Sequence, residues 1–180
     1  TGSPVTDRRG ITLAIALRTA NGTLSVAGSA CMKWTLLKSA LIAYWDRHRE
    51  DAPAPKRSHI DPIEIPRLLP YVGLVDVEDN GAGFRFRLVG QHIVDNHGRN
   101  IAGDRIEPQG AAPGSIDCPL IGQLYPVFRD AVQKPGIQSL ITTYDNAQGR
   151  RTRISLVALP LFTAPGEIGM LFGGALLEPR

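Results

Sequence analysis

The chain has 180 residues, of which 43% are hydrophobic and 21% charged, which fits one globular domain with its own core rather than a disordered or fibrous protein. Its 20 basic and 17 acidic residues give a formal net charge of +3, and no aromatic side chains are interleaved with the basic clusters, so nucleic acid is not an expected partner. The 2 cysteines lie outside any Cys-x-x-Cys motif, and no apolar run approaches the length of a membrane-spanning helix. We therefore expect no disulfide framework and no membrane partner, and we expect a cytoplasmic location.

The N-terminal segment, residues 1–31, is the least regular part of the sequence. Ile11–Leu17 and Thr23–Ala27 are compatible with two strands, because Asn21-Gly22 between them favours a tight turn. Met32 directly precedes a strong helical pattern, which favours a loosely attached extension instead. We predict that residues 1–31 are a poorly ordered or peripheral extension and that residues 32–180 form a single domain.

Residues 34–50 have the pattern of an amphipathic helix. The apolar side chains recur at intervals of three and four and therefore share one face: Trp34, Leu37, Leu41, Tyr44 and Trp45. Basic residues at its end suit the negative end of the helix dipole, and Pro53 prevents any continuation. Such a stripe packs by default against the domain that follows, and we also expect it to form the interface of a homodimer.

A short, capped helical turn is predicted next. Asp61 is placed to accept a hydrogen bond from the backbone N–H of Glu64, and the Glu64 side chain can reach back to the cap. Pro66 and Pro70 stop the turn from growing into a longer helix. This segment is expected to be the corner between the N-terminal helix and the sheet.

Two short strands and a helix follow this corner. Residues 72–77 and 84–89 are predicted to pair as an antiparallel hairpin, with Phe84, Phe86 and Leu88 on one face of the second strand. Residues 91–97 are predicted to form a short helix, which Gly98 ends in the left-handed conformation.

The remaining elements are a helix and three strands. The segment 103–114 is rich in glycine and proline and is expected to be a loop. A helix is predicted over residues 116–132, which Pro126 should kink or split. The β-rich runs 137–144, 152–161 and 168–177 are separated by turn signals and predict three successive antiparallel strands.

The order of these elements and several motifs resemble the PAS_5 family, small PAS-like proteins found mainly in alphaproteobacteria. The motifs are Tyr44-Trp45, Arg57-Ser-His-Ile-Asp-Pro62, Leu68-Leu-Pro70, Leu74-Val-Asp-Val77, Phe86-Arg-Leu-Val-Gly90, Gly98-Arg99, Ala102-Gly103 and Leu159-Pro-Leu161. The resemblance implies an α+β fold, a five-stranded antiparallel sheet with helices on one face and an N-terminal amphipathic helix. It also implies a sensory or interaction module.

No catalytic set is visible in the sequence. The motifs of serine hydrolases, zinc proteases, P-loop proteins and dinucleotide-binding proteins are missing. His92 and His97 are five residues apart, which puts them on different sides of a helix, so no metal site is predicted. The cofactor stays undefined: the Asn-Cys-Arg-Phe-Leu-Gln signature of flavin-binding light sensors is missing, and haem bound through His92 or His97 is a weaker alternative.

A cavity between sheet and helices, if present, would be lined mostly by apolar side chains. The candidate ligand-binding residues are Phe86, Arg87, Leu88, Ile93, Phe128, Ile154, Leu156 and Phe172, each of which could equally be plain core. Arg87 is the polar candidate: it would either contact an acidic ligand or form a structural salt bridge with Asp61 or Asp76.

Three functions remain open at this point. The preferred hypothesis is a non-enzymatic sensory module that binds a small apolar or amphipathic ligand or a signalling partner, and that forms a homodimer. The second is a structural protein–protein adaptor with a filled core and no ligand. The third is an enzyme of unknown type.

Overall fold

The computed structural model describes residues 26–108 and 118–180 of the chain. The helices are α1 (Val26–Arg49), α2 (Gln91–His97) and α3 (Cys118–Gln133), with four short 3-10 turns, η1 (Arg57–His59), η2 (Pro62–Glu64), η3 (Leu69–Tyr71) and η4 (Asp79–Gly81). The strands are β1 (Val72–Glu78), β2 (Gly83–Val89), β3 (Arg105–Ile106), β4 (Gln138–Asp145), β5 (Arg151–Ala164) and β6 (Glu167–Pro179). The strands predicted at 11–17 and the turn at 21–22 lie outside the described residues.

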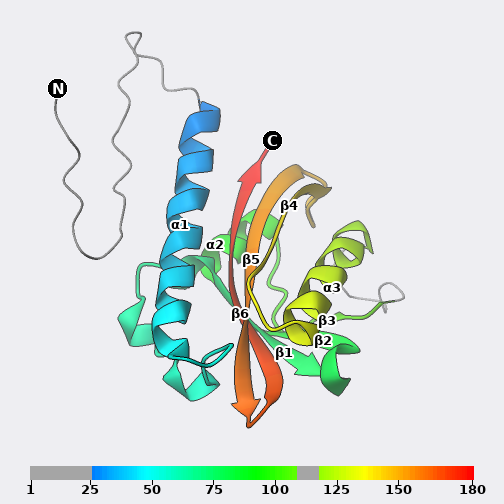
Figure 1. The fold of residues 1–180 in the computed structure, drawn as a ribbon. Helices are drawn as coiled ribbons and strands as arrows, with labels where there is room; N and C mark the ends of the chain where they lie inside the picture. The colour runs from blue at the N-terminus through cyan, green and yellow to red at the C-terminus, as the bar shows by residue number, and fades with distance from the viewer. Residues whose placement is uncertain (1–25, 109–117) are drawn as a thin grey trace, which may run out of the picture.

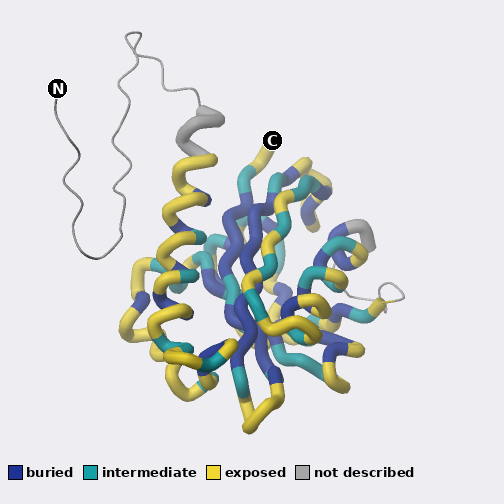
Figure 2. Tube along the Cα trace, viewed as in Figure 1, coloured by how far each residue is buried: buried dark blue, intermediate teal, exposed yellow. Residues whose placement is uncertain are grey.

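The strands form one antiparallel sheet of six strands in the order β3-β2-β1-β6-β5-β4. The two long strands β5 and β6 lie side by side in the interior of the sheet and are buried over most of their length (Figures 1 and 2). The sixth strand is β3, which falls in the segment predicted to be a loop. Arg105 of this strand binds Glu78 of β1 and so attaches the short edge strand to the hairpin.

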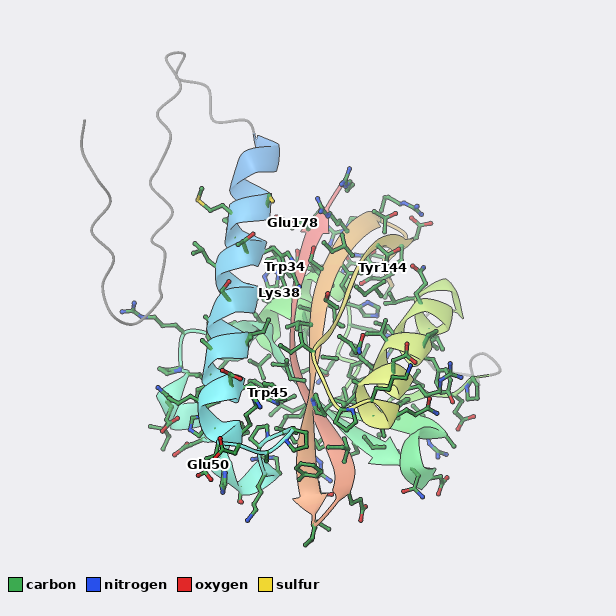
Figure 3. The ribbon with its side chains drawn as sticks, in the orientation of Figure 1. Trp34, Lys38, Trp45, Glu50, Tyr144 and Glu178 are labelled. Carbon is green, nitrogen blue, oxygen red and sulfur yellow. The ribbon has the colours of Figure 1, made fainter. Side chains whose placement is uncertain are left out.

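The two faces of the sheet are covered by different helices. α2 and α3 cover one face, here called the inner face, and α1 lies on the opposite, outer face (Figure 1). Leu41 of α1 is fully buried over Gly174 of β6, and the indole N–H of Trp45 donates a 2.8 Å hydrogen bond to the carbonyl of Pro160. Trp34 and Trp45 point from α1 toward the sheet in Figure 3. The predicted packing of this stripe against its own domain is therefore observed.

α1 begins earlier than the sequence pattern suggested, at Val26 rather than at Trp34. Its first turns therefore occupy part of the segment that was compatible with a strand over Thr23–Ala27. α3 begins at Cys118 and runs through Pro126 as one helix, so the proline does not split it.

A β-bulge changes the predicted side-chain alternation of β2. The register shifts between Leu74 and Val75, so that Val75 pairs with Phe86 whereas Leu74 pairs with Leu88. Arg87 is therefore an extra residue opposite β1. Beyond it, the side chains of β2 alternate between the two faces of the sheet in the opposite order. Phe84 and Phe86 are buried, but Leu88 is 45% exposed, so Leu88 does not share their face as predicted.

The corner between α1 and the sheet is capped differently from the prediction. The Asp61 carboxylate accepts a hydrogen bond from the backbone N–H of Ile63, at 2.9 Å, while Glu64 donates its N–H to the Asp61 carbonyl. The Glu64 carboxylate turns away from the cap and binds Arg47 and His48 at the end of α1. The corner is thus tied to the helix by the contacts of Glu64 with Arg47 and His48.

Candidate functional site

Two small apolar cavities lie between the inner face of the sheet and the helices α2 and α3. Each has a volume of about 40 Å³. Gly73 of β1, Ile93 of α2 and Ala175 of β6 border both cavities, so the Ile93 side chain lies at the boundary between them. Small residues on the sheet and one branched side chain on the helix therefore set the size and the separation of the two spaces.

A buried polar pair borders the second cavity. His97, at the end of α2, is 2% exposed, and its Nδ1 lies 2.8 Å from the hydroxyl of Tyr144 on β4. The two rings are stacked, with an interplanar angle of 23°. The surrounding side chains are apolar: Phe86, Val89, Ile101, Leu120, Leu124, Ile154 and Leu177. Because buried polar groups require hydrogen-bonding partners, His97 and Tyr144 form a polar pair within an otherwise apolar cavity lining.

The position of His97 is fixed by the turn between β4 and β5. Asn146 is buried, and its side-chain amide donates a hydrogen bond to the carbonyl of Asn96, at 2.8 Å. The backbone N–H of Ala147 donates to the carbonyl of His97, at 3.0 Å. Gly98 ends α2 with a φ of 93°, as predicted, in the left-handed conformation. The turn therefore satisfies carbonyls at the end of α2 that the helix itself leaves free.

The first turn of α2 is anchored to the ends of the central strands β1 and β6. Gly90 donates its N–H to the carbonyl of Val72 at 2.8 Å, and a Cβ at this position would overlap the backbone of Leu69 and Pro70. His92 accepts a hydrogen bond at Nε2 from the backbone N–H of Leu177, at 3.2 Å, and its ring packs on Tyr71. Desolvation by burial lowers the pKa of His92. The neutral ring is therefore the form that this contact holds.

Arg87 lies on the outer face, away from both cavities. Its Nε donates to the two carboxylate oxygens of Asp76, at 2.8 and 3.0 Å. This contact raises the pKa of the guanidinium. Of the two roles considered for Arg87, the structure shows the salt bridge with Asp76.

The other candidate ligand-binding residues are distributed unevenly. Phe86, Ile93 and Ile154 border the second cavity, and Ile93, Phe128 and Phe172 border the first. Leu156 is buried but borders neither, and Leu88 is on the outer face beyond the bulge. The side chains of the cavity set are therefore Phe86, Ile93, Phe128 and Ile154, to which the structure adds His97 and Tyr144, whereas the ring of Phe172 packs against Tyr44 of α1 on the outer face.

The residues predicted for a dimer interface are buried within the chain itself. Trp34, Leu37, Leu41, Tyr44 and Trp45 are at most 8% exposed. The opposite face of α1 is the accessible one: Met32 is 62% and Leu36 66% exposed. A homodimer formed through α1 would use this second face.

Tyr144 was missed by sequence reasoning although a signal for it existed. Leu140, Thr142 and Tyr144 alternate along β4 and pair with Leu156, Ile154 and Thr152 on β5, which places Tyr144 on the inner face. Within the parts of the chain that the structure describes, no three His, Cys, Asp or Glu side chains gather as a metal site.

Residues 35–176 match the family model PAS_5, described as a PAS domain. The chain belongs to the PAS_5 family. Members of the PAS class are sensory and signalling modules, and the match covers well over half of the chain, including every strand of the sheet except the last three residues of β6. None of the helices in the described residues is long and apolar enough to span a membrane.

The solved structures that resemble this PAS_5 chain are distant in sequence. A variant of the fungal photoreceptor Vivid has 15% identity and a TM-score of 0.44, and the alignment covers 76% of this chain and 92% of that one. A sensory box histidine kinase/response regulator from Burkholderia thailandensis has 12% identity and a TM-score of 0.41, covering 65% and 84%. The blue-light photoreceptor Aureochrome1 LOV has 14% identity and a TM-score of 0.41, covering 63% and 84%. A comparison with curated protein sequences gave no match.

Proposed function

We propose that this PAS_5 protein is a non-enzymatic sensory module that binds a small apolar or amphipathic molecule between the inner face of its sheet and the helices α2 and α3. The observation that supports the proposal is the pair of adjoining cavities, separated by Ile93 and bordered by the His97–Tyr144 pair. The apolar walls would bind the body of the ligand, and a polar group on the ligand would lie next to the His97–Tyr144 pair.

Binding requires the two cavities to become one. Typical ligand pockets measure about 300–1,000 Å³, whereas each cavity here is about 40 Å³. Displacing the Ile93 side chain would join them, and Ile93 belongs to α2, a helix of 7 residues. A ligand would therefore act on the position of α2.

A shift of α2 would be transmitted to α1 on the outer face through a series of contacts. α2 contacts β6 through the His92–Leu177 hydrogen bond and contacts η3 through the tilted packing of the His92 ring on Tyr71. Tyr71 directly precedes β1, whose neighbour β6 carries Gly174, the residue on which Leu41 of α1 rests. The proposed signal is a change in how α1 lies on the outer face, where a homodimer or a signalling partner would bind.

The second candidate function is a structural adaptor with a filled core. The small size of both cavities favours it, since spaces of about 40 Å³ hold water-sized molecules only. Under this alternative α1 and the outer face still bind a partner, but nothing enters the core.

Substituting Gly73→Ala distinguishes the two functions. The nearest atom to a new Cβ is the Leu88 carbonyl oxygen at 3.7 Å, so the methyl group fits without strain and reduces the space that both cavities share. Native mass spectrometry of protein purified from its own host would measure the retained mass. The sensor model predicts a retained ligand in the wild type that is lost in Gly73→Ala, at unchanged or slightly higher stability.

Gly122→Ala is the matched control. Gly122 lies in α3 with no atom within 4 Å of a new Cβ, so the same chemical change occurs away from the cavities. Retention of the ligand should be unaffected by Gly122→Ala. Wild-type protein from its host that carries no small molecule, in repeated preparations, would refute the sensor model and leave the adaptor.

A further inference from the structure

A third hollow, much larger than the two inner cavities, lies at the C-terminal end of α1. It is a groove of about 790 Å³, formed by residues 48–59 at the end of α1 and residues 162–166 of the turn between β5 and β6. Figure 1 shows these two segments side by side at the lower end of α1, and Figure 3 labels Glu50 there. This volume is within the range of small-molecule sites, which is about 300–1,000 Å³.

The two walls of the groove are joined by backbone contacts. Phe162 donates its N–H to the carbonyl of Pro55 at 2.9 Å, and Lys56 forms a parallel bridge with Phe162. Ala54 and Pro55 are buried at this junction. The groove is thus part of the folded domain and does not depend on the chance position of a single loop.

The charges bordering the groove are mainly positive. Arg49, Lys56 and Arg57 face a single carboxylate, Glu50, and the imidazoles of His48 and His59 also line the groove. Arg49 is already bound to Asp46, and His48 to Glu64. Arg57 donates only to the carbonyl of Ile60, and Lys56 makes no side-chain hydrogen bond or ion pair within the described residues. Lys56 and Arg57 therefore remain available to an anion.

The negative end of the α1 dipole, which would repel an anion, is partly neutralised. The carbonyl of Arg49 accepts the N–H of Ala52 at 2.9 Å, and the carbonyl of His48 lies 3.4 Å from Nδ1 of His59. Glu50 itself adopts a φ of 52°, a conformation that costs free energy for a residue other than glycine. The strained residue lies at the groove, where it turns the chain away from the helix axis.

The remaining lining of the groove is apolar and would contact the apolar part of a ligand, next to the charged residues. It consists of Ala52, Ala54, Pro55, Phe162, Ala164 and Pro165. We propose that the groove binds an amphipathic organic anion, with its carboxylate or phosphate at Lys56 and Arg57 and its apolar body against Phe162. This site is separate from the inner cavities, on which the proposed sensory function rests.

NMR titration of isotopically labelled full-length protein tests the site. Adenosine monophosphate and octanoate are the two anionic probes, each compared with its neutral counterpart, adenosine or 1-octanol, and with inorganic phosphate as a head group alone. We expect saturable shifts in residues 48–59 and 162–166 with at least one anionic probe, and weaker or no shifts with its neutral counterpart. The difference between each anion and its neutral counterpart isolates the contribution of the phosphate or the carboxylate.

Two variants and a control locate the contacts. Lys56→Gln should weaken binding by about fivefold, the effect of one partly exposed charge pair, and Ala164→Trp should block the apolar part of the groove. Lys134→Gln removes an equally exposed charge after α3 and should leave the affinity unchanged. The proposal is overturned if neither anion shifts the groove residues at millimolar concentration, if neutral probes bind equally well, or if the shifts fall only around Ile93 and Leu124. That last result would instead support the inner cavity as the ligand site.

Discussion

The most informative single residue is His92, because it joins α2 to the end of β6. Its Nε2 accepts the Leu177 N–H, and its ring packs on Tyr71. Desolvation by burial lowers its pKa, and Lys33 acts in the same direction, whereas the backbone of Leu177 and the carboxylates of Asp95 and Glu178 oppose this shift without reversing it. An accepting nitrogen must be unprotonated, so protonation and this contact exclude each other.

Folding stability should therefore depend on pH through His92. With a folded-state pKa below the ordinary value of about 6.5, the unfolded chain binds the proton more tightly. The stabilisation is complete above about pH 6.5 and is lost as the pH falls through the folded-state pKa. Urea denaturation across this range should show a loss of about 1 kcal/mol attributable to one hydrogen bond.

His92→Gln is the control for this effect, since the glutamine oxygen can accept from Leu177 but does not titrate. In this variant the free energy of unfolding should fall less between neutral and mildly acidic pH than it does in the wild type. An identical pH profile in both proteins would show that other groups cause the drop.

Tyr144 provides a second residue-scale prediction. Removing its hydroxyl in Tyr144→Phe takes a partner from Nδ1 of His97, which is buried. We expect the free energy of unfolding to fall by about 1–3 kcal/mol. Calorimetry measures this loss, and a variant as stable as the wild type would show that the hydrogen bond contributes little.

At the scale of elements, the docking of α1 depends on a close approach to β6. A Cβ on Gly174 would lie 2.2 Å from Cδ1 of Leu41, which is fully buried. Gly174→Ala should therefore cost about 1–3 kcal/mol through overpacking. Leu41→Ala alone should cost about 2–5 kcal/mol, because it leaves a cavity over the sheet.

The two substitutions should not be additive. In the double variant the new methyl group of Ala at position 174 occupies the space left by Leu41, so the cost of the second substitution should nearly vanish. Chemical denaturation of the four proteins of this cycle gives the coupling. Simple addition of the two costs would mean that α1 does not rest on Gly174.

At the scale of the whole molecule, the exposed face of α1 is where a homodimer is expected. Leu36 is 66% exposed, next to Met32 on the same face, and Ala40 and Ala43 extend this surface along the helix. Leu36→Glu should shift the protein from dimer to monomer in sedimentation equilibrium, because a charge would enter an apolar contact.

Ile141→Glu is the matched control, since Ile141 is 53% exposed on the edge strand β4. It should leave the oligomeric state unchanged. A wild type that is monomeric at all accessible concentrations would contradict the dimer, whereas dissociation by Ile141→Glu alone would move the interface to β4.

The sequence by itself determined the elements that depend on local backbone preferences. The hairpin of β1 and β2, the helix over Gln91–His97 and its end at Gly98 follow from alternation and from the left-handed conformation that glycine tolerates. The family motifs are also local, and they indicated the PAS class before any long-range contact was known.

Only the tertiary structure decided how distant segments meet. The bulge at Arg87 inverts the face of Leu88 because β1 imposes the pairing register, which alternation along one strand cannot reveal. His97 and Tyr144 are 47 residues apart, and the groove combines residues 48–59 with 162–166. Periodicity showed that α1 had an apolar face, but packing against β5 and β6 decided that this face is used inside the domain, which leaves the opposite face exposed.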